Sequence, residues 1–308
     1  GAVAESRLPA LFTDHMVLQR DTEVPIWGWA DPGTDVKVSF RSQWATATAG
    51  PDGKWPLKMG AIPARGPYSL VVQSGNEAIT VRDVLVGEVW IASGQSNMQW
   101  AVRQSDDAEL EIRSANYPQI RLFYVPRETA ETPQDDVDAV WTECNSDTIP
   151  GFSAVAYYFG RELHDTLNIP IGLIHTSWGG TPAESWTSRR SLEAYGELRP
   201  ILDRWDGIVE NYPAAYERYE KALEAYEEAA RIADENGEDR PPRPGAPAGP
   251  DHPHRPASLH NGMLAPLIPY AFRGAIWYQG ESNAGRAYQY RTLFPAMIND
   301  WRRSWGGK

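Results

Sequence analysis

Residues 93–98, Ser-Gly-Gln-Ser-Asn-Met, come directly after an apolar run and place a serine where it could act as a nucleophile. The run itself, residues 84–92, has the pattern of a buried strand. In an open α/β sheet the reactive crevice lies at the carboxyl ends of the strands, and Ser96 would stand there at the entry to the next helix. Free backbone N–H groups at such a helix start can stabilise an anion. The pattern favours nucleophilic chemistry on Ser96, with an ordinary polar turn as the alternative.

Two further apolar runs also end in polar loops. Residues 171–177 are followed by Trp-Gly-Gly-Thr at 178–181, and residues 273–278 by Gln-Gly-Glu-Ser-Asn at 279–283. Paired glycines after a parallel strand allow the backbone to approach a ligand closely, although a tight turn that needs positive φ explains them as well. Three polar loops at three strand ends would all face the same crevice.

The residues before this region, 1–83, predict a small antiparallel β-sandwich. Short alternating runs recur there without helical periodicity, and turn signals such as Asp31-Pro32-Gly33 separate them. This part could bind sugar or brace its neighbour, and bracing is favoured because no chemically active residues cluster in it. Residues 84–308 then form the α/β domain. The alternating runs are 24–29, 36–40, 44–48, 68–72 and 78–81.

An insertion, residues 206–256, interrupts the α/β domain. Apolar residues between 212 and 233 step by four and three, which predicts a long helix with one apolar face. Such a face is more typical of a helical hairpin arm or a packing surface than of a cofactor site. The proline-rich stretch 240–256 should be extended. Further helices are predicted at 106–114, 151–167 and 288–304.

Composition limits the classes of function. The 308 residues carry a net charge of −12, which argues against nucleic acid and anionic membranes as partners. The single cysteine, Cys144, permits no intrachain disulfide, and no Cys/His spacing suits a metal, so we expect neither a metal nor another cofactor. No apolar run approaches the length of a membrane span. The chain starts at Gly1 without a signal peptide, as a processed form would, and we expect a secreted or periplasmic protein.

The three loops resemble, in order and position, blocks I, II and III of the SGNH hydrolases. The first loop departs from the Gly-x-Ser-x-Gly elbow of other serine hydrolases, because Met98 replaces the second glycine. Gly-Gln-Ser-Asn-Met is most similar to the sialate O-acetylesterase-like carbohydrate esterases, which also carry a β-rich segment before block I. The resemblance thus covers roughly the whole chain. It implies an α/β fold with a flavodoxin-like parallel sheet, preceded by the β-sandwich.

The resemblance also implies a serine esterase that removes O-acetyl groups from a carbohydrate through an acetyl-serine intermediate. Sialic acid or an acetylated plant or bacterial polysaccharide such as xylan would be the substrate. A non-catalytic carbohydrate-binding protein is the alternative, since the many aromatic residues could stack on sugars. A lipid esterase of the same fold is disfavoured, because the sequence has no long apolar lid.

Carried over by resemblance, Ser96 matches the nucleophile, and the N–H groups of Ser96 and Gly180 match oxyanion donors. The third loop lacks the glycine-x-asparagine of other SGNH enzymes, so the side-chain donor is expected at Gln279, with Asn283 as the alternative. A carboxamide suits this task because it donates an N–H without carrying charge. Glu281 would orient a histidine or the loop itself. Substrate-binding or supporting roles are expected for Gln95, Asn97, Trp178, Gly179 and Trp186.

A general base is missing from these loops. SGNH enzymes take it from a C-terminal Asp-x-x-His block, and of the six histidines only His254, in Asp-His-Pro-His at 251–254, has this spacing. That match precedes the third loop instead of following it. The helix at 288–304 also ends in glycines, without the further parallel strand that a doubly wound sheet requires. We therefore expect that Lys308 is not the natural end of the folded unit. A second polypeptide would supply the Asp-x-x-His block, with His254 as the alternative base.

Overall fold

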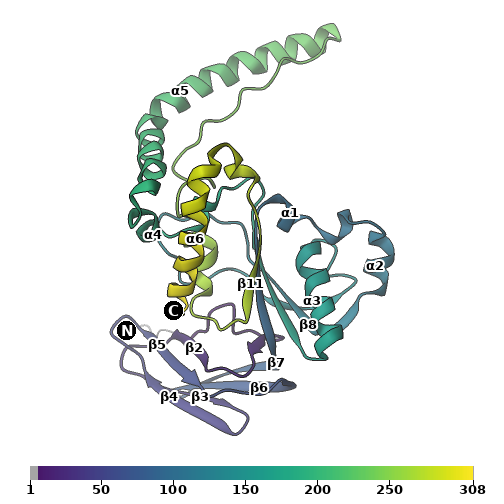
Figure 1. Ribbon diagram of the computed structural model, residues 1–308, viewed down its shortest axis with the longest axis vertical. Helices are drawn as coiled ribbons and strands as arrows, with labels where there is room; N and C mark the ends of the chain where they lie inside the picture. The colour runs from purple at the N-terminus through teal and green to yellow at the C-terminus, as the bar shows by residue number, and fades with distance from the viewer. Residues whose placement is uncertain (1–5, 308) are drawn as a thin grey trace.

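One long strand organises residues 6–307, the part of the chain that the structure, a computed structural model, describes (Figure 1). This strand, β7 (Glu77–Gly94), pairs antiparallel with β6 (Arg65–Ser74) along its first half. Its second half pairs in parallel with β10 (Ile171–Ser177) and with β11 (Gly274–Tyr278). Because β10 and β11 are both in register with residues 90–94, they lie on opposite edges of β7. The strand therefore ends between two parallel neighbours.

The main sheet is mixed, whereas the sequence predicted a parallel sheet behind a separate β-sandwich. Among residues 6–307, nine strands share it in the order β4-β3-β6-β7-β10-β8-β9, with β1 and β11 also paired to β7, while β2 and β5 form a two-stranded sheet. The α/β class is confirmed, and β3, β4 and β6 are antiparallel as predicted for residues 1–83. They share one sheet with the parallel strands instead of forming a separate sandwich, and within residues 84–308 β9 pairs antiparallel with β8, so the sheet predicted there is not purely parallel. The remaining strands are β1 (Val17–Gln19), β2 (Val24–Trp29), β3 (Asp35–Phe40), β4 (Gln43–Thr48), β5 (Lys54–Met59), β8 (Asn116–Tyr124) and β9 (Trp141–Asn145).

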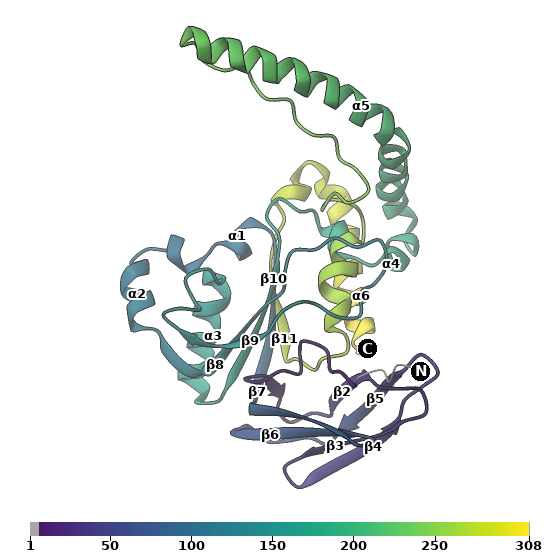
Figure 2. The same ribbon diagram turned by 180° about the vertical axis from the view of Figure 1, so that it is seen from behind.

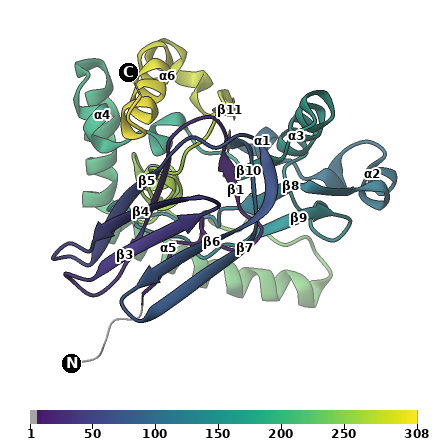
Figure 3. The same cartoon turned by 90° about the horizontal axis from the view of Figure 1, so that it is seen from below.

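The predicted boundary between residues 83 and 84 falls inside β7. The first half of the strand is partly exposed, and its second half is almost completely buried, which explains why the sequence pattern changes from alternating to continuously apolar. Asp83 separates the halves, with a left-handed backbone at φ 54°. Figure 3 shows β3, β4 and β6 side by side, and β6 pairs with the first half of β7. The β-rich part and the α/β part thus share one element.

Helices cover both faces of the parallel part of the sheet. On one face α3 (Ala154–Leu167) packs against β8 and β10, and on the other lies α6 (Ala287–Ser304) (Figures 1 and 2). Consecutive residues of β10 enter the two cores, since Leu173 packs with the α3 side and Ile174 with the α6 side. The other α-helices are α1 (Ser96–Gln99), α2 (Ala108–Ser114), α4 (Arg189–Glu193) and α5 (Arg199–Asn236).

The helix α5 projects from the body as an arm (Figures 1 and 2). Its 38 residues correspond to about 57 Å of helix measured along the axis, and the helix bends along its length (Figure 1). The proline-rich chain after Gly237 runs back along the helix, and a Cβ atom placed on Gly249 would lie 2.5 Å from the Tyr212 ring. The predicted apolar stripe is therefore a packing face that is covered only in part, since Ala230 and Ala233 are buried whereas Tyr216 is 41% exposed. The chain returns as an extended segment, so the arm is one helix and not a helical hairpin. Neither α5 nor any other helix within residues 6–307 is long and apolar enough to cross a membrane.

Candidate active site

Ser96 lies at the carboxyl end of β7, where it is exposed and begins the short helix α1. Gly94, two residues earlier, has φ 141°, and a Cβ atom there would come within 2.1 Å of the Tyr278 carbonyl oxygen. Glycine is needed for β7 and β11 to approach this closely. The Gln95 N–H then donates to the same carbonyl oxygen over 2.9 Å. The two strands thereby hold Ser96 at the edge of the sheet.

The loop after β10 lies against Ser96. Trp178 N–H donates to Gly94 O over 3.1 Å, and Gly179 N–H donates to Gln99 Oε1 over 2.7 Å. A Cβ atom on Gly179 would lie 3.5 Å from the Ser96 Cβ, so the backbone of Gly179 approaches the serine closely. Trp178 and Gly179, for which supporting roles were predicted, therefore bring this loop against Ser96.

Two backbone N–H groups at this place have no acceptor among residues 6–307. The Ser96 N–H belongs to the first residue of a helix, where no intrahelical partner exists. The Gly180 N–H follows Gly179 in an exposed turn with φ 78°. Donors of this kind stabilise the oxyanion that forms when a serine attacks a carbonyl group. Both predicted backbone donors are thus able to bind a ligand.

The loop after β11 is tied to the first loop by two side chains. Gln95 Oε1 accepts the N–H of Gly280 over 3.4 Å and that of Ser282 over 3.3 Å. Asn97 Nδ2 donates to Glu281 Oε1 over 3.0 Å. In the described part of the chain Glu281 contacts no histidine, so its observed partner is the first loop. Gln95 and Asn97 hold the loop that carries Gln279 against the helix that begins at Ser96.

The Gln279 carboxamide lies in a network of hydrogen bonds. Its Nε2 donates to Asn283 Oδ1 over 2.6 Å and to Thr181 O over 3.3 Å. Its Oε1 accepts from the Tyr290 hydroxyl over 3.0 Å. Burial raises the pKa of Tyr290, which keeps the hydroxyl protonated as a donor. The longer bond to Thr181 is the one that an oxyanion could replace, because a charged acceptor binds an N–H more strongly than a carbonyl does.

Glu184, a residue to which the sequence analysis assigned no role, is buried behind these loops. It lies on the short turn η2 (Ala183–Trp186) and is 2% exposed. Its Oε2 accepts from Asn283 Nδ2 over 2.8 Å, and its Oε1 lies 2.6 Å from Arg286 and 3.4 Å from Arg204. A single acidic residue in a short turn is a weak sequence signal, because its three partners lie elsewhere in the chain.

The aromatic residues near the loops differ in their access to solvent. Trp186 is completely buried, and its Nε1 donates to Thr181 Oγ1 over 2.9 Å. Its position is therefore a supporting one, under the second loop. Trp178 is half-buried, whereas Trp100 and Tyr278 are 49% and 46% exposed. Trp100 and Tyr278 are the rings that could stack on a sugar beside Ser96.

No imidazole bonds to the Ser96 hydroxyl within residues 6–307. His254 contacts the second loop, through a hydrogen bond between its ring and the backbone of Gly180, and its ring centroid is 4.6 Å from that of His252. Burial lowers the pKa of His254, against the opposing effects of Glu184 and Gly180. At neutral pH the ring is therefore neutral and able to accept a proton.

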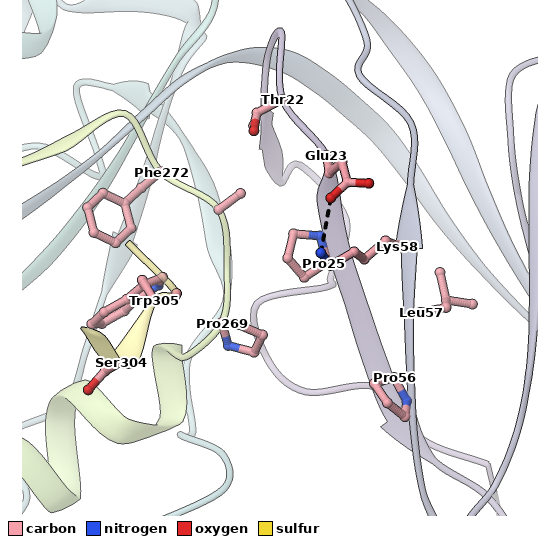
Figure 4. A pocket seen from close by; sticks show the side chains of 12 residues that line it. Thr22, Glu23, Pro25, Pro56, Leu57, Lys58, Pro269, Phe272, Ser304 and Trp305 are labelled. Atoms are coloured by element: carbon pink, nitrogen blue, oxygen red, sulfur yellow. Dashed lines mark hydrogen bonds and ion pairs between the residues drawn. The ribbon is translucent and has the colours of Figure 1, made fainter. Parts of the chain in front are cut away.

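A hollow of about 880 Å³ lies between the β2–β5 sheet and the end of α6, where Figure 4 shows Glu23 and Lys58 across from Phe272 and Trp305. No predicted site residue lines it, so it is separate from the chemistry proposed for Ser96.

His15, Asp83 and Glu143 bring their ligand atoms within 4.8 Å of one another, as the ligands of a metal ion would. Arg121 already pairs with both carboxylates, at 2.6 Å from Asp83 and 3.5 Å from Glu143. The guanidinium group therefore supplies the positive charge at this place.

Comparisons with known proteins decide the family. Over residues 86–223 the chain matches the family described as carbohydrate esterase, sialic acid-specific acetylesterase. It is 32% identical over 97% of its length to the sialate O-acetylesterase of Homo sapiens, and 34% identical over 99% of its length to that of Rattus norvegicus. The chain belongs to this carbohydrate esterase family.

The crystal structure of a carbohydrate acetylesterase from Xanthomonas citri is similar to this chain along nearly the whole length of the chain. The TM-score is 0.77 at 34% identity, and the match covers 99% of this chain and 58% of the other. The chain spans 53% of the human relative and 57% of the rat relative, about half the length of the curated relatives it matches. The family predicted from the three loops is thus confirmed. The roles of Ser96, Gly180 and Gln279 stay predictions.

Proposed function

We propose that this chain builds the catalytic site of an esterase that removes O-acetyl groups from a carbohydrate through an acetyl-serine on Ser96. The observation that carries the proposal is the exposed Ser96 beside two backbone N–H groups without acceptors in residues 6–307, its own and that of Gly180. A nucleophile next to oxyanion donors is what acyl transfer requires. The names of the relatives, sialate O-acetylesterase and carbohydrate acetylesterase, support an acetylated sugar as the class of substrate.

The reaction proceeds in two half-reactions. Ser96 Oγ loses its proton to a base and attacks the acetyl carbonyl, whose oxygen becomes an oxyanion. This oxyanion accepts hydrogen bonds from the N–H groups of Ser96 and Gly180 and from one N–H of Gln279. The sugar oxygen takes up the proton and leaves as a hydroxyl, with the acetyl group on Ser96. Water then attacks this ester, releases acetate and restores the serine.

The base has two candidates. Within this chain the candidate is His254, because its ring contacts Gly180 and is neutral at neutral pH. The other candidate is the histidine of an Asp-x-x-His block on a second polypeptide, which stays a prediction. Loss of a triad member leaves only weak catalysis. A His254→Ala variant that keeps wild-type kcat would eliminate the first candidate.

Two groups of substrate fit the proposal, O-acetylated sialic acid and acetylated plant or bacterial polysaccharides. The exposed rings of Trp100 and Tyr278 provide surfaces on which a pyranose of either group can stack. We also propose a secreted or periplasmic location, because acetylated glycans of both groups lie outside the cytoplasm.

Acetate release from p-nitrophenyl acetate, O-acetylated sialic acid and acetylated xylan tests the proposal. The variant is Ser96→Ala, and the matched control is Ser146→Ala, an exposed serine away from the three loops. We expect Ser96→Ala to fold normally and to lose turnover, and a serine-directed phosphonate to label Ser96 in the wild type. A label on another serine, or full turnover in Ser96→Ala, would overturn the proposal. Sugar binding by the wild type without acetate release would instead favour a non-catalytic carbohydrate-binding protein.

A further inference from the structure

The buried carboxylate of Glu184 is a point where four segments of the chain meet. Its own turn, η2, receives Asn283 and Arg286 from the loop after β11, and Arg204 from the arm helix α5. The Glu184 carbonyl oxygen also accepts the N–H of Ala257, in the proline-rich segment, over 3.0 Å. Burial of a carboxylate is costly unless charges and hydrogen bonds compensate for the lost water. The Glu184 side chain is 2% exposed, and both of its oxygens have partners: the Asn283 amide at Oε2, and the guanidinium groups of Arg286 and Arg204 at Oε1.

A chain of hydrogen bonds leads from Glu184 through Asn283 to Gln279, and Glu184 sets which atom donates at each step. A carboxylate only accepts hydrogen bonds, so Asn283 presents Nδ2 to Glu184 Oε2, at 2.8 Å. Asn283 Oδ1 therefore faces the other way, where it accepts from Ala183 N–H over 2.9 Å and from Gln279 Nε2 over 2.6 Å. Gln279 Oε1 in turn accepts from the Tyr290 hydroxyl over 3.0 Å. The orientation of both carboxamides thus follows from the carboxylate of Glu184.

We propose that Glu184 is a positioning residue, which acts through Asn283 to fix the side of the Gln279 carboxamide that faces the ester site. This inference rests on the proposed function, because it takes Gln279 as an oxyanion donor. Asn283 Oδ1 accepts one N–H of the Gln279 carboxamide over 2.6 Å. The other N–H makes only the longer bond of 3.3 Å to Thr181 O, and this N–H is the one that would bind the oxyanion. A carboxamide turned by half a rotation would present its oxygen and repel the oxyanion.

The exchange Glu184→Gln tests this role with almost no change in side-chain size. Arg286, at 2.6 Å, holds the oxygen of the new side chain, so the new NH₂ group faces that of Asn283 and Asn283 must turn. We expect kcat to fall by about 10- to 100-fold, with KM changed by less than about threefold. The matched control is Glu193→Gln, which removes an exposed acid that pairs with Arg189, and it should keep the wild-type kcat.

A second exchange should restore the order of donors and acceptors. In the double variant Glu184→Gln with Asn283→Asp, the carboxylate at position 283 accepts from the new amide on one side and from Gln279 on the other. Asn283→Asp alone places a second carboxylate beside that of Glu184, and the two repel each other. The kcat of the double variant should exceed that of both single variants by about tenfold. If Glu184 serves only as a counter-ion of the arginines, Glu184→Gln lowers the melting temperature and leaves kcat unchanged, and the proposal is wrong.

A measurement that does not depend on turnover separates this inference from the proposed function. The side-chain NH₂ signals of Gln279 in nitrogen–proton correlation spectra are assigned as the pair that is lost in Gln279→Glu. We expect slow exchange of these protons with solvent in the wild type, faster exchange in Glu184→Gln and slow exchange again in the double variant. Unchanged exchange in Glu184→Gln overturns the inference, whatever the turnover. The expected exchange without any Ser96-dependent turnover overturns only the proposed function.

Discussion

Asn97 Nδ2 and Glu281 Oε1 form a hydrogen bond of 3.0 Å between two loops that are 184 residues apart in the sequence. Asn97 directly follows Ser96, so the bond connects the start of helix α1 with the loop that carries Gln279. The bond is exposed, and water can replace either partner, which limits its contribution to the free energy of unfolding. Its effect is expected mainly in the geometry around Ser96.

Removal of this bond should lower activity with little effect on stability. We expect Glu281→Ala to lower kcat/KM by about 3- to 10-fold, since a misplaced third loop weakens stabilisation of the transition state. The melting temperature should stay close to that of the wild type. Steady-state kinetics and thermal unfolding measure both, with Glu238→Ala, an exposed acid at the end of the arm, as the control. Wild-type kcat/KM in Glu281→Ala would show that the bond does not position the loop.

The Gln279 side chain should contribute mainly to kcat. Removal of one oxyanion donor typically lowers kcat by about 10²–10³, and we expect a loss of this size for Gln279→Ala, with a smaller change in KM. The matched control is Gln73→Ala, which removes an exposed glutamine side chain on strand β6, outside the three loops. A Gln279→Ala variant with wild-type kcat would make the side chain purely structural.

Gly94 should tolerate no side chain. A methyl group there would lie 2.1 Å from the Tyr278 carbonyl oxygen, on a backbone with φ 141°. We expect Gly94→Ala to reduce the free energy of unfolding by about 3 kcal/mol or more, through overlap and backbone strain together. In Gly285→Ala no atom lies within 4 Å of the added methyl group, so this control should unfold like the wild type in urea. Equal unfolding curves for the two variants would contradict the close contact between β7 and β11.

The stability of the fold should depend on pH through His175. Burial, reinforced by Arg127, lowers the pKa of His175 to about 3, whereas the unfolded chain titrates near its ordinary value. Between these values the unfolded state binds more protons, so stability is fully present above about pH 6.5 and falls as the pH is lowered. The loss is up to about 1.4 kcal/mol per pH unit.

Urea unfolding between pH 7 and 5 measures this contribution above the range in which most carboxylates titrate. Burial also lowers the pKa values of His252, His254 and His260, so the contribution of His175 is the difference in pH dependence between the wild type and a His175 variant. The variant His175→Asn should be less stable than the wild type at pH 7, because it leaves a different group beside Ser177, but its stability should change less with pH. The control is His164→Asn, which replaces a half-buried imidazole on helix α3. If His175→Asn keeps the wild-type slope, another group causes the pH dependence.

Much of the fold could be predicted from local patterns. The strand predicted at residues 171–177 is β10, Ile171–Ser177, and the helix predicted at 288–304 is α6, Ala287–Ser304. These elements could be predicted because the spacing of apolar residues within one segment already distinguishes a strand from a helix. The continuity of β7 was missed for the same reason, since its two halves have different patterns and only their neighbours show that they form one strand.

Residue types at fixed spacing were enough to predict the family, the order of the three loops and the candidate nucleophile Ser96. The complete burial of Trp186, and the distance of 2.8 Å between Glu184 and Asn283, which are 99 residues apart, could not be predicted in this way. The reason is physical. A hydrogen bond or an ion pair depends on distances of about 3 Å and on the exclusion of water, and packing sets both between segments that no local pattern connects.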